Sequence, residues 1–240
     1  CPHPRLAHQP RATRGKLMQS VAHGSMLSVR APAHDVESVL DEHSAVAAIN
    51  SPKLCVLSGP LESMQKAEAE LAKRDIACKL LATSHAFHSP MMDNIVPEFH
   101  DVTSEMAYAK PEIPIMSTVT GAWMKNDEAC DPAYWSNHLR KTVRFSDAVS
   151  SVWGENADQV LLEVGPGTTS TTLARQQITD ITRQVAIPSL GKPSDAEHER
   201  RNVLARQRRV RDAVVALVQG ALGLGLAARG DRDDLRERKR

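Results

Sequence analysis

Cysteine is scarce in this sequence, and no two cysteines lie close together. The 240 residues contain 4 cysteines and no C-x-x-C pair, the spacing used by many structural zinc sites and redox centres. Scattered thiols of this kind favour reduced cysteines over a disulfide framework. The sequence therefore predicts a protein of a reducing compartment, the cytoplasm.

Long apolar runs and an excess of charge of one sign are also absent. The most apolar segment, 213–228, is shorter than a bilayer-crossing helix and is interrupted by Gln219 and by glycines. Residues 1–13 contain no apolar core of a signal peptide. Lys and Arg number 30 against 29 Asp and Glu, so the formal net charge is +1. We therefore expect neither a membrane nor a nucleic acid as a partner.

Residues 25–83 alternate between short strand and helix patterns. Helical spacing follows Asp35 and Pro60, and the second helix is expected to bury Leu61, Met64 and Leu71 on one face. Strands are expected at 26–29, 46–49, 54–57 and 77–83. The order βαββαβ is that of a ferredoxin-like unit, in which a four-stranded antiparallel sheet carries two helices on one face.

The segment after residue 84 alternates between helices and strands at longer spacing. Its apolar periodicity predicts helices at 90–106, 145–153 and 168–177, and strands at 113–119, 159–164 and 184–190. Such alternation implies a parallel sheet covered by helices. The predicted fold class is α/β, with the ferredoxin-like unit inserted into a larger α/β domain.

The motif SHAFHSP at 84–90 places His88 in a short polar link between a strand and a helix. Histidine titrates near neutral pH, at roughly 6.5 when unperturbed, so a rigidly held histidine can take up and return a proton. Loop residues positioned by flanking elements often carry function. On the local pattern alone, two histidines that merely lie in a turn remain the alternative.

Seven segments, taken in order, resemble the malonyl-CoA:acyl carrier protein acyltransferase domains of type I polyketide synthases. They are RGKLMQ (14–19), GSMLSV (24–29), AAINSP (47–52), VLSG (56–59), SHAFHSPMM (84–92), YWSNHLRKTVRF (134–145) and LEVGPG (162–167). The resemblance implies an α/β-hydrolase-like core interrupted by a ferredoxin-like subdomain. The large, partial subdomain would comprise 14–24 and 84–204, and the small one 25–83. Residues 1–13 form an atypical flank.

The nucleophile of that family is missing from the sequence. The family uses a serine in a G-H-S-x-G turn between a strand and a helix, and no G-x-S-x-G occurs here. We therefore expect the carboxyl-terminal part of a catalytic domain, inactive by itself. The alternatives are a non-catalytic scaffold or CoA-ester-binding fragment of a synthase, and a regulatory βαββαβ domain that binds a ligand.

The resemblance makes His88 the general base of a Ser/His ping-pong reaction. The base would activate the serine for attack on malonyl-CoA, and malonyl would then pass to the phosphopantetheine thiol of an acyl carrier protein. No cofactor is expected in the domain itself, and the other implied partners are neighbouring synthase domains. A zinc site is not expected, because His85, His88, Asp93 and His100 are not spaced as three or four convergent ligands.

Two residues of the RGKLMQ segment are expected at the acyl group. Arg14 resembles the arginine that binds the free carboxylate of malonyl, a task suited to a guanidinium, which is always charged and offers a planar pair of donors. Seen without the motif, Arg14 would be an ordinary solvated charge. Met18 lies one helical turn onward and would line the same pocket, although methionine at this spacing is ordinarily a core residue.

The residues around the base are expected to select the acyl group. HAFH is the form of malonyl-selecting domains, whereas methylmalonyl-selecting domains typically have YASH. Phe87 would occupy the space of a 2-methyl branch, and excluding one methyl group contributes about 1 to 3 kcal/mol of discrimination. His85 and Ser89 would line the same substrate site.

The segment YWSNHLR supplies a second histidine, His138, at a position where the family has a polar residue whose backbone or side chain orients the base. Such a contact would fix the tautomer of the base. A histidine on a helix surface is the alternative. Asp93 and Glu163 are acidic candidates for a triad, but the family works with a dyad.

From about residue 205 the composition changes to Arg, Ala, Gly, Leu and Asp, and the resemblance ends. Charges of both signs predict that 205–240 is a solvated, disordered or non-native tail. A basic arm for nucleic acid is the alternative, but acidic residues dilute its charge and no aromatic side chain is available for stacking.

Overall fold

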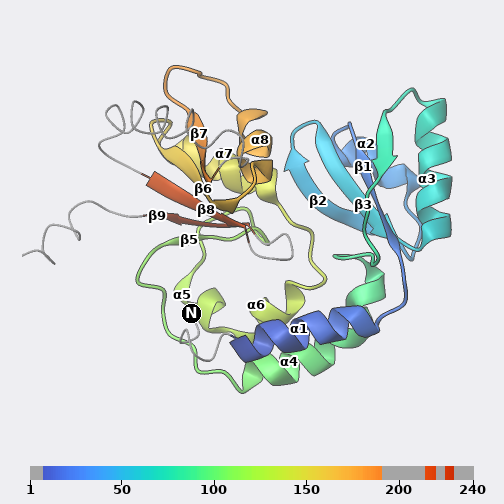
Figure 1. Ribbon diagram of the computed structural model, residues 1–240, viewed down its shortest axis with the longest axis horizontal. Coiled ribbons are helices and arrows are strands. Elements are labelled where there is room, and N and C mark those ends of the chain that lie inside the picture. The colour runs from blue at the N-terminus through green and yellow to red at the C-terminus, as the bar shows by residue number, and fades with distance from the viewer. Residues whose placement is uncertain (1–7, 191–213, 220–224, 230–240) are drawn as a thin grey trace, which may run out of the picture. The chain divides into compact units, whose positions relative to one another are not determined.

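The computed structural model describes residues 8–190, 214–219 and 225–229 (Figure 1). The chain divides into two units, and each is described by itself. The first unit comprises Cys1–Pro111 and Lys125–Arg144, and the second comprises Glu112–Met124 and Phe145–Arg240. All of the residues expected at the active site lie in the first unit.

The first unit contains a four-stranded sheet in the order β2-β3-β1-β4, with every pair antiparallel. Its strands are β1 (Ser25–Val29), β2 (Ala45–Ser51), β3 (Leu54–Gly59) and β4 (Cys78–Leu80). The helices between them are α2 (Ala33–Val36), the 3₁₀ helix η1 (Glu37–Val39) and α3 (Leu61–Lys73). The expected βαββαβ order and antiparallel pairing are confirmed.

One face of this sheet forms a core with α3 and α2. Successive side chains of a strand point to opposite faces, so alternate residues of β1 and β3 meet the helices. The buried members include Leu27, Val29, Val36, Cys55, Leu57, Met64, Ala67 and Leu71. Each fully buried large aliphatic side chain contributes roughly 1.5 to 3 kcal/mol. The expectation for Leu61 is wrong: its side chain is 48% exposed, because it begins α3 one turn before the first residue that packs on the sheet.

The link that follows β4 supplies Phe87, which packs on the opposite face of the sheet. Met26, Ala47 and Val56 form a small buried cluster on this face, and Phe87 packs against it. The link begins when β4 ends at Leu80, because the chain turns there and Thr83 N donates to Leu81 O at 2.9 Å. The predicted strand at 77–83 is therefore shorter than expected.

The remaining helices of the first unit enclose a second core. They are α1 (His8–Ser20), the 3₁₀ helix η2 (Pro90–Ile95), α4 (Val96–Ser104), α5 (Asn126–Cys130) and α6 (Pro132–Asn137). In Figure 1, α1 and α4 lie side by side. The core consists of Leu17, Met18, Met92, Ile95, Phe99 and Leu139. The helix expected at 90–106 begins as a 3₁₀ turn and ends at Ser104, before Met106.

The second unit contains a mixed sheet in the order β5-β9-β8-β6-β7. Strand β6 (Val160–Pro166) pairs in parallel with β7 (Val185–Leu190) and β8 (Val214–Gln219), as alternation with α7 (Phe145–Glu155) and α8 (Thr169–Arg175) predicts. Strands β9 (Gly225–Arg229) and β5 (Ile115–Met116) add antiparallel pairs. The predicted strand at 113–119 is thus only two residues long, because Ser117 begins a turn closed by Ser117 N donating to Ala122 O.

Strands β8 and β9 lie within the range predicted to be a tail without regular structure. For 214–219 and 225–229 that expectation differs from the structure, since β8 pairs with β6 along its length. The remaining residues of 205–240 and the flank 1–7 lie outside the described residues. Within the described part of the chain, no helix combines the length and the apolar character of a membrane span.

Candidate active site

His88 lies in the link between β4 and η2, and its side chain is buried. Its φ angle is +58°, in the left-handed region that few residues other than glycine adopt, although histidine is among the more frequent exceptions. Such backbone strain persists where surrounding contacts fix the conformation, and it concentrates at functional sites. The link is therefore a rigid mount for an imidazole, as the sequence predicts.

The start of β1 fixes the position of this link. Gly24 N donates to Ser84 O at 3.1 Å, and a Cβ atom at Gly24 would lie 2.6 Å from the Cβ of Ala86. That separation is shorter than side chains tolerate, so only glycine allows the two backbones to approach this closely. The close approach holds the residues just before His88 against the sheet.

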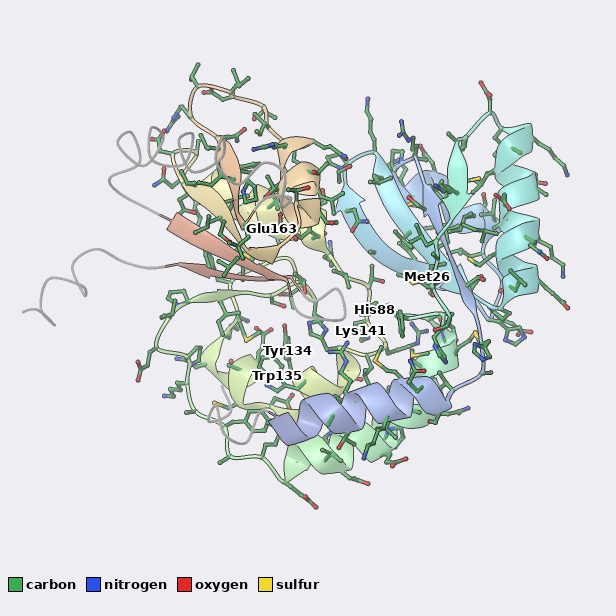
Figure 2. All side chains as sticks on the ribbon, in the orientation of Figure 1. Met26, His88, Tyr134, Trp135, Lys141 and Glu163 are labelled. Carbon is green, nitrogen blue, oxygen red and sulfur yellow. The ribbon has the colours of Figure 1, made fainter. Side chains whose placement is uncertain are left out.

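The imidazole is oriented by a main-chain carbonyl. His88 Nδ1 donates to Lys141 O at 2.8 Å, and Figure 2 shows the two residues next to each other. Because a carbonyl only accepts, Nδ1 carries the hydrogen and Nε2 keeps the lone pair that a general base needs. Sequence reasoning missed Lys141, and no signal could have revealed it, since every residue type has the same carbonyl.

The carbonyl of Lys141 is itself held in place on both sides. Lys141 N donates to Asn137 O at 2.9 Å, which closes the turn after α6. On the other side, Thr142 Oγ1 donates to Val46 O at 2.7 Å and Val143 N donates to Ala47 O at 2.9 Å. These bonds tie the segment to β2. The orientation of the base therefore depends on the sheet and on α6 together.

Arg14 lies on α1 and is 8% exposed, which is unusual for a guanidinium. Its Nε and Nη2 atoms are buried without a hydrogen-bond partner among the described residues. Burial lowers the pKa of Arg14 to about 10, so the side chain remains charged at neutral pH. A buried charge with unused donors is costly, and an anion would offset that cost.

His138 is also buried, at the carboxyl end of α6. The expectation that it orients the base is not met, because the Lys141 carbonyl already accepts from His88 Nδ1. Instead, Nδ1 of His138 is buried without a partner among the described residues. The sequence position of His138 predicts that it orients His88. The conformation of the turn after α6 instead places the Lys141 carbonyl at the imidazole.

The positive charge of Arg14 acts on both His88 and His138. The pKa of His88 is lowered to about 4, first through burial and then through the positive charge of Arg14, while the Lys141 carbonyl partly opposes both. The pKa of His138 falls to about 3, first through burial, then through Arg14 and then through His88, while its own main chain partly opposes these effects. Both imidazoles are therefore neutral at pH 7. The site combines a neutral base with one fixed positive charge.

The other predicted site residues occupy different surroundings. His85 is buried, bonds through Nδ1 to Ser84 Oγ at 2.8 Å and stacks on His23 with 5.1 Å between ring centroids. Phe87 is partly buried and packs against two of the three clusters described above, the small one around Met26 and the helical core. Met18 is 2% exposed and belongs to the helical core, the ordinary role of such a methionine.

The hydroxyl group of Ser89 has a structural role. Ser89 Oγ donates to Ala86 O at 2.7 Å and accepts from Met91 N at 3.2 Å, which caps η2. The side chain is fully buried. The geometry therefore does not support the predicted substrate contact, because a capping hydroxyl has already used its hydrogen.

Neither acidic candidate for a triad is paired with His88. Asp93 Oδ1 accepts from Arg140 Nε at 2.7 Å at an exposed position. Glu163, in the second unit, is fully buried and accepts from Ser170 N at 3.2 Å and from Thr171 N at 2.9 Å, which caps α8. The arrangement suits a dyad. In the described ranges, no three acidic, histidine or cysteine side chains converge as metal ligands.

Comparison with known proteins gives one consistent family. A family model described as the acyl transferase domain matches residues 7–214. Polyketide synthase GfsA of Streptomyces halstedii is 36% identical over 169 residues, which cover 69% of this chain and 2% of that protein. Mycoketide-CoA synthase of Mycobacterium tuberculosis is 37% identical over 156 residues, which cover 65% of this chain and 4% of that protein.

Solved structures agree with this comparison. The acyltransferase domain from the second module of the salinomycin polyketide synthase is 32% identical, with a TM-score of 0.78 over 85% of this chain and 48% of that one. A malonyl CoA-acyl carrier protein transacylase from Clostridium perfringens, 20% identical, shares the fold with a TM-score of 0.72 over 84% of this chain and 63% of that one. This chain thus spans about half of the solved synthase domain.

Proposed function

We infer that this chain, which belongs to the acyltransferase domains of type I polyketide synthases, carries the base and the carboxylate-binding arginine of a malonyl transfer reaction. The observation that supports this most directly is the buried guanidinium of Arg14, which has donors without a partner among the described residues and whose positive charge lowers the pKa of His88. Malonyl ends in a carboxylate that would satisfy those donors. Acetyl has no such group.

In the proposed reaction, Nε2 of His88 takes the proton of a serine hydroxyl. The serine oxygen attacks the malonyl thioester carbonyl, the carbon–sulfur bond breaks, and His88 returns the proton to the CoA thiolate. In the second half-reaction the thiol of a carrier-protein phosphopantetheine attacks the acyl-serine. His88 takes the thiol proton and returns it to the serine. The serine belongs to a G-H-S-x-G segment, which the 240 residues do not contain.

Malonyl, rather than a branched extender, is the proposed acyl group. The support is the HAFH motif, in which Phe87 stands directly before the proposed base and packs against two buried apolar clusters. A ring held in this way would leave little room for a 2-methyl branch. Removing one methyl contact changes selectivity by about 1 to 3 kcal/mol, so the preference would be moderate.

The fold is proposed to follow the plan of the family. Residues 25–83 would be the ferredoxin-like small subdomain, inserted between 14–24 and 84–204 of an α/β-hydrolase-like core. The support is the antiparallel order β2-β3-β1-β4 in one sheet and the parallel pairing of β6 in the other. A carrier protein and neighbouring synthase domains would be the partners, in the cytoplasm.

The test uses this chain joined behind a G-H-S-x-G segment of a related acyltransferase, hereafter the serine-containing domain. Transfer of malonyl from malonyl-CoA to a carrier protein is measured for the wild type and for His88→Ala. Removing a general base should lower kcat by about 10²- to 10⁴-fold. An unchanged rate in His88→Ala would contradict the role of His88 as the base, whereas no transfer by the wild type would favour the non-catalytic CoA-ester-binding scaffold.

A further inference from the structure

His138 is a buried histidine of the candidate site that has no part in the proposed reaction. Its Nδ1 atom is shielded from solvent and has no hydrogen-bond partner among the described residues. The role that the sequence predicts for it, orientation of the base, belongs to the Lys141 carbonyl. A buried donor or acceptor left without a partner destabilises a protein, so such an atom needs an explanation.

The surroundings of His138 also contain buried polar atoms without a hydrogen-bond partner among the described residues. Arg14 contributes two further unpartnered nitrogen atoms, Nε and Nη2, and its charge acts on both His138 and His88. No aspartate or glutamate is among the groups that shift either histidine. Three buried nitrogen atoms without an acceptor among the described residues suit an anionic ligand.

We propose that His138 is a second hydrogen-bond donor to the malonyl carboxylate that Arg14 binds, and so a residue that determines selectivity for carboxylated acyl groups. A carboxylate has two oxygen atoms with about four lone-pair positions. It can therefore accept from the guanidinium and from one imidazole N–H at the same time. The inference rests on the proposed function, which it extends from one contact to two.

The placement of His138 suits a fixed donor. It ends α6, a helix capped by Asp131 and packed against α4. The ring of Tyr134 lies edge-on to the imidazole, with 6.1 Å between centroids and 72° between planes. Leu139, the next residue, is fully buried in the helical core. These contacts hold the imidazole without using its Nδ1 atom.

The test measures binding and stability on the 240-residue chain itself. Dissociation constants for malonyl-CoA and acetyl-CoA, and the melting temperature without ligand, are determined for the wild type, His138→Leu, His138→Gln and Arg14→Ala. In His138→Leu, malonyl-CoA should bind about 10- to 100-fold more weakly and acetyl-CoA unchanged, since a hydrogen bond to a charged group is lost only with malonyl. His138→Gln keeps a donor and should recover part of this loss.

The melting temperature distinguishes a ligand-binding role of His138 from a structural one. A structural residue should lower it when replaced. Because His138 Nδ1 is unpartnered, His138→Leu should leave the melting temperature of the free chain unchanged or raise it. His100→Leu is the matched control. Both ring nitrogen atoms of His100 have partners, Ser136 Oγ at 3.2 Å and Ser104 Oγ at 3.3 Å. His100→Leu should therefore lower the melting temperature and keep the preference for malonyl-CoA.

The outcomes separate the inference from the proposed function. If Arg14→Ala loses the preference for malonyl-CoA while His138→Leu keeps it, the inference is wrong and the proposed function stands. If His138→Leu lowers the melting temperature and weakens both esters equally, His138 is a structural residue and the inference is also wrong. If the wild type binds both esters equally, both the inference and the proposed function are overturned.

Discussion

His88 donates its Nδ1 hydrogen to the main-chain carbonyl of Lys141 at 2.8 Å, across 53 residues of sequence. This bond fixes the tautomer of the base without a carboxylate. Because a backbone carbonyl carries no net charge, it stabilises an imidazolium less than an aspartate would. The base is thus oriented but is not made strongly basic, which agrees with a pKa of His88 lowered to about 4 by burial and by Arg14.

The first prediction concerns Lys141 in the serine-containing domain. Lys141→Ala keeps the carbonyl and should change kcat by less than about 3-fold, because surface substitutions away from special features have small effects. Lys141→Pro removes the N–H that donates to Asn137 O and should lower kcat at least about 10-fold with KM retained. Steady-state kinetics measure both, and equal losses in the two variants would show that the lysine side chain matters.

The second prediction concerns Arg14 in the same domain. Arg14→Ala should lower kcat/KM for malonyl transfer about 10- to 100-fold, since a charge-assisted contact to the carboxylate is lost. Acetyl transfer should change little, because acetyl carries no carboxylate. Competition between the two CoA esters measures the ratio. A similar loss for both acyl groups would contradict the assignment of Arg14 as the carboxylate ligand.

The third prediction concerns acyl selection. Changing HAFH to YASH through His85→Tyr and Phe87→Ser should shift selectivity from malonyl toward methylmalonyl by about 10-fold or somewhat more, the effect of one methyl contact. Phe87 also packs against two clusters, so the variant should unfold at a lower temperature. The ratio of kcat/KM values reports selectivity independently of stability. An unchanged ratio in an active variant would make Phe87 a core residue only.

The fourth prediction concerns pH and the free energy of unfolding of the 240-residue chain. Folding lowers the pKa of His88 to about 4 and of His138 to about 3, whereas an unfolded histidine titrates at roughly 6.5. Between these values the unfolded state binds more protons, so stability is present above pH 6.5 and is lost as the pH falls toward 4. Each histidine contributes a slope of up to about 1.4 kcal/mol per pH unit.

Denaturant unfolding at pH 7, 6 and 5 checks that slope. His138→Leu removes one of the two titrating groups and should make the decline in stability between pH 6 and pH 5 shallower. A slope that is the same in the wild type and in His138→Leu would mean that His138 takes up a proton as readily in the folded state as in the unfolded state.

The fifth prediction concerns acylation of the 240-residue chain without a serine elbow. Incubation with radiolabelled malonyl-CoA followed by denaturing electrophoresis should leave the protein unlabelled, because His88 has no G-x-S-x-G hydroxyl to activate. The serine-containing domain is the positive control and should carry the label. A stable label on the 240-residue chain would identify a different nucleophile.

The sequence by itself determined most of the local elements and the position of the proposed base, His88, in a link between two of them. Alternating apolar residues fix which face of a strand is buried, so the βαββαβ order and its antiparallel sheet follow from pattern. Gly24, the left-handed His88 and the Ser89 cap are also local features, because each depends on what one residue type permits in the backbone.

The tertiary structure alone decided which groups meet. The acceptor of His88 is a backbone carbonyl, which has no sequence signature, and its position depends on bonds from the turn after α6 to β2. The pattern also could not predict that Arg14 is buried, that Nδ1 of His138 has no hydrogen-bond partner among the described residues or that Leu61 is exposed. Burial and pKa are properties of the assembled surroundings, because both depend on which atoms replace water around a group.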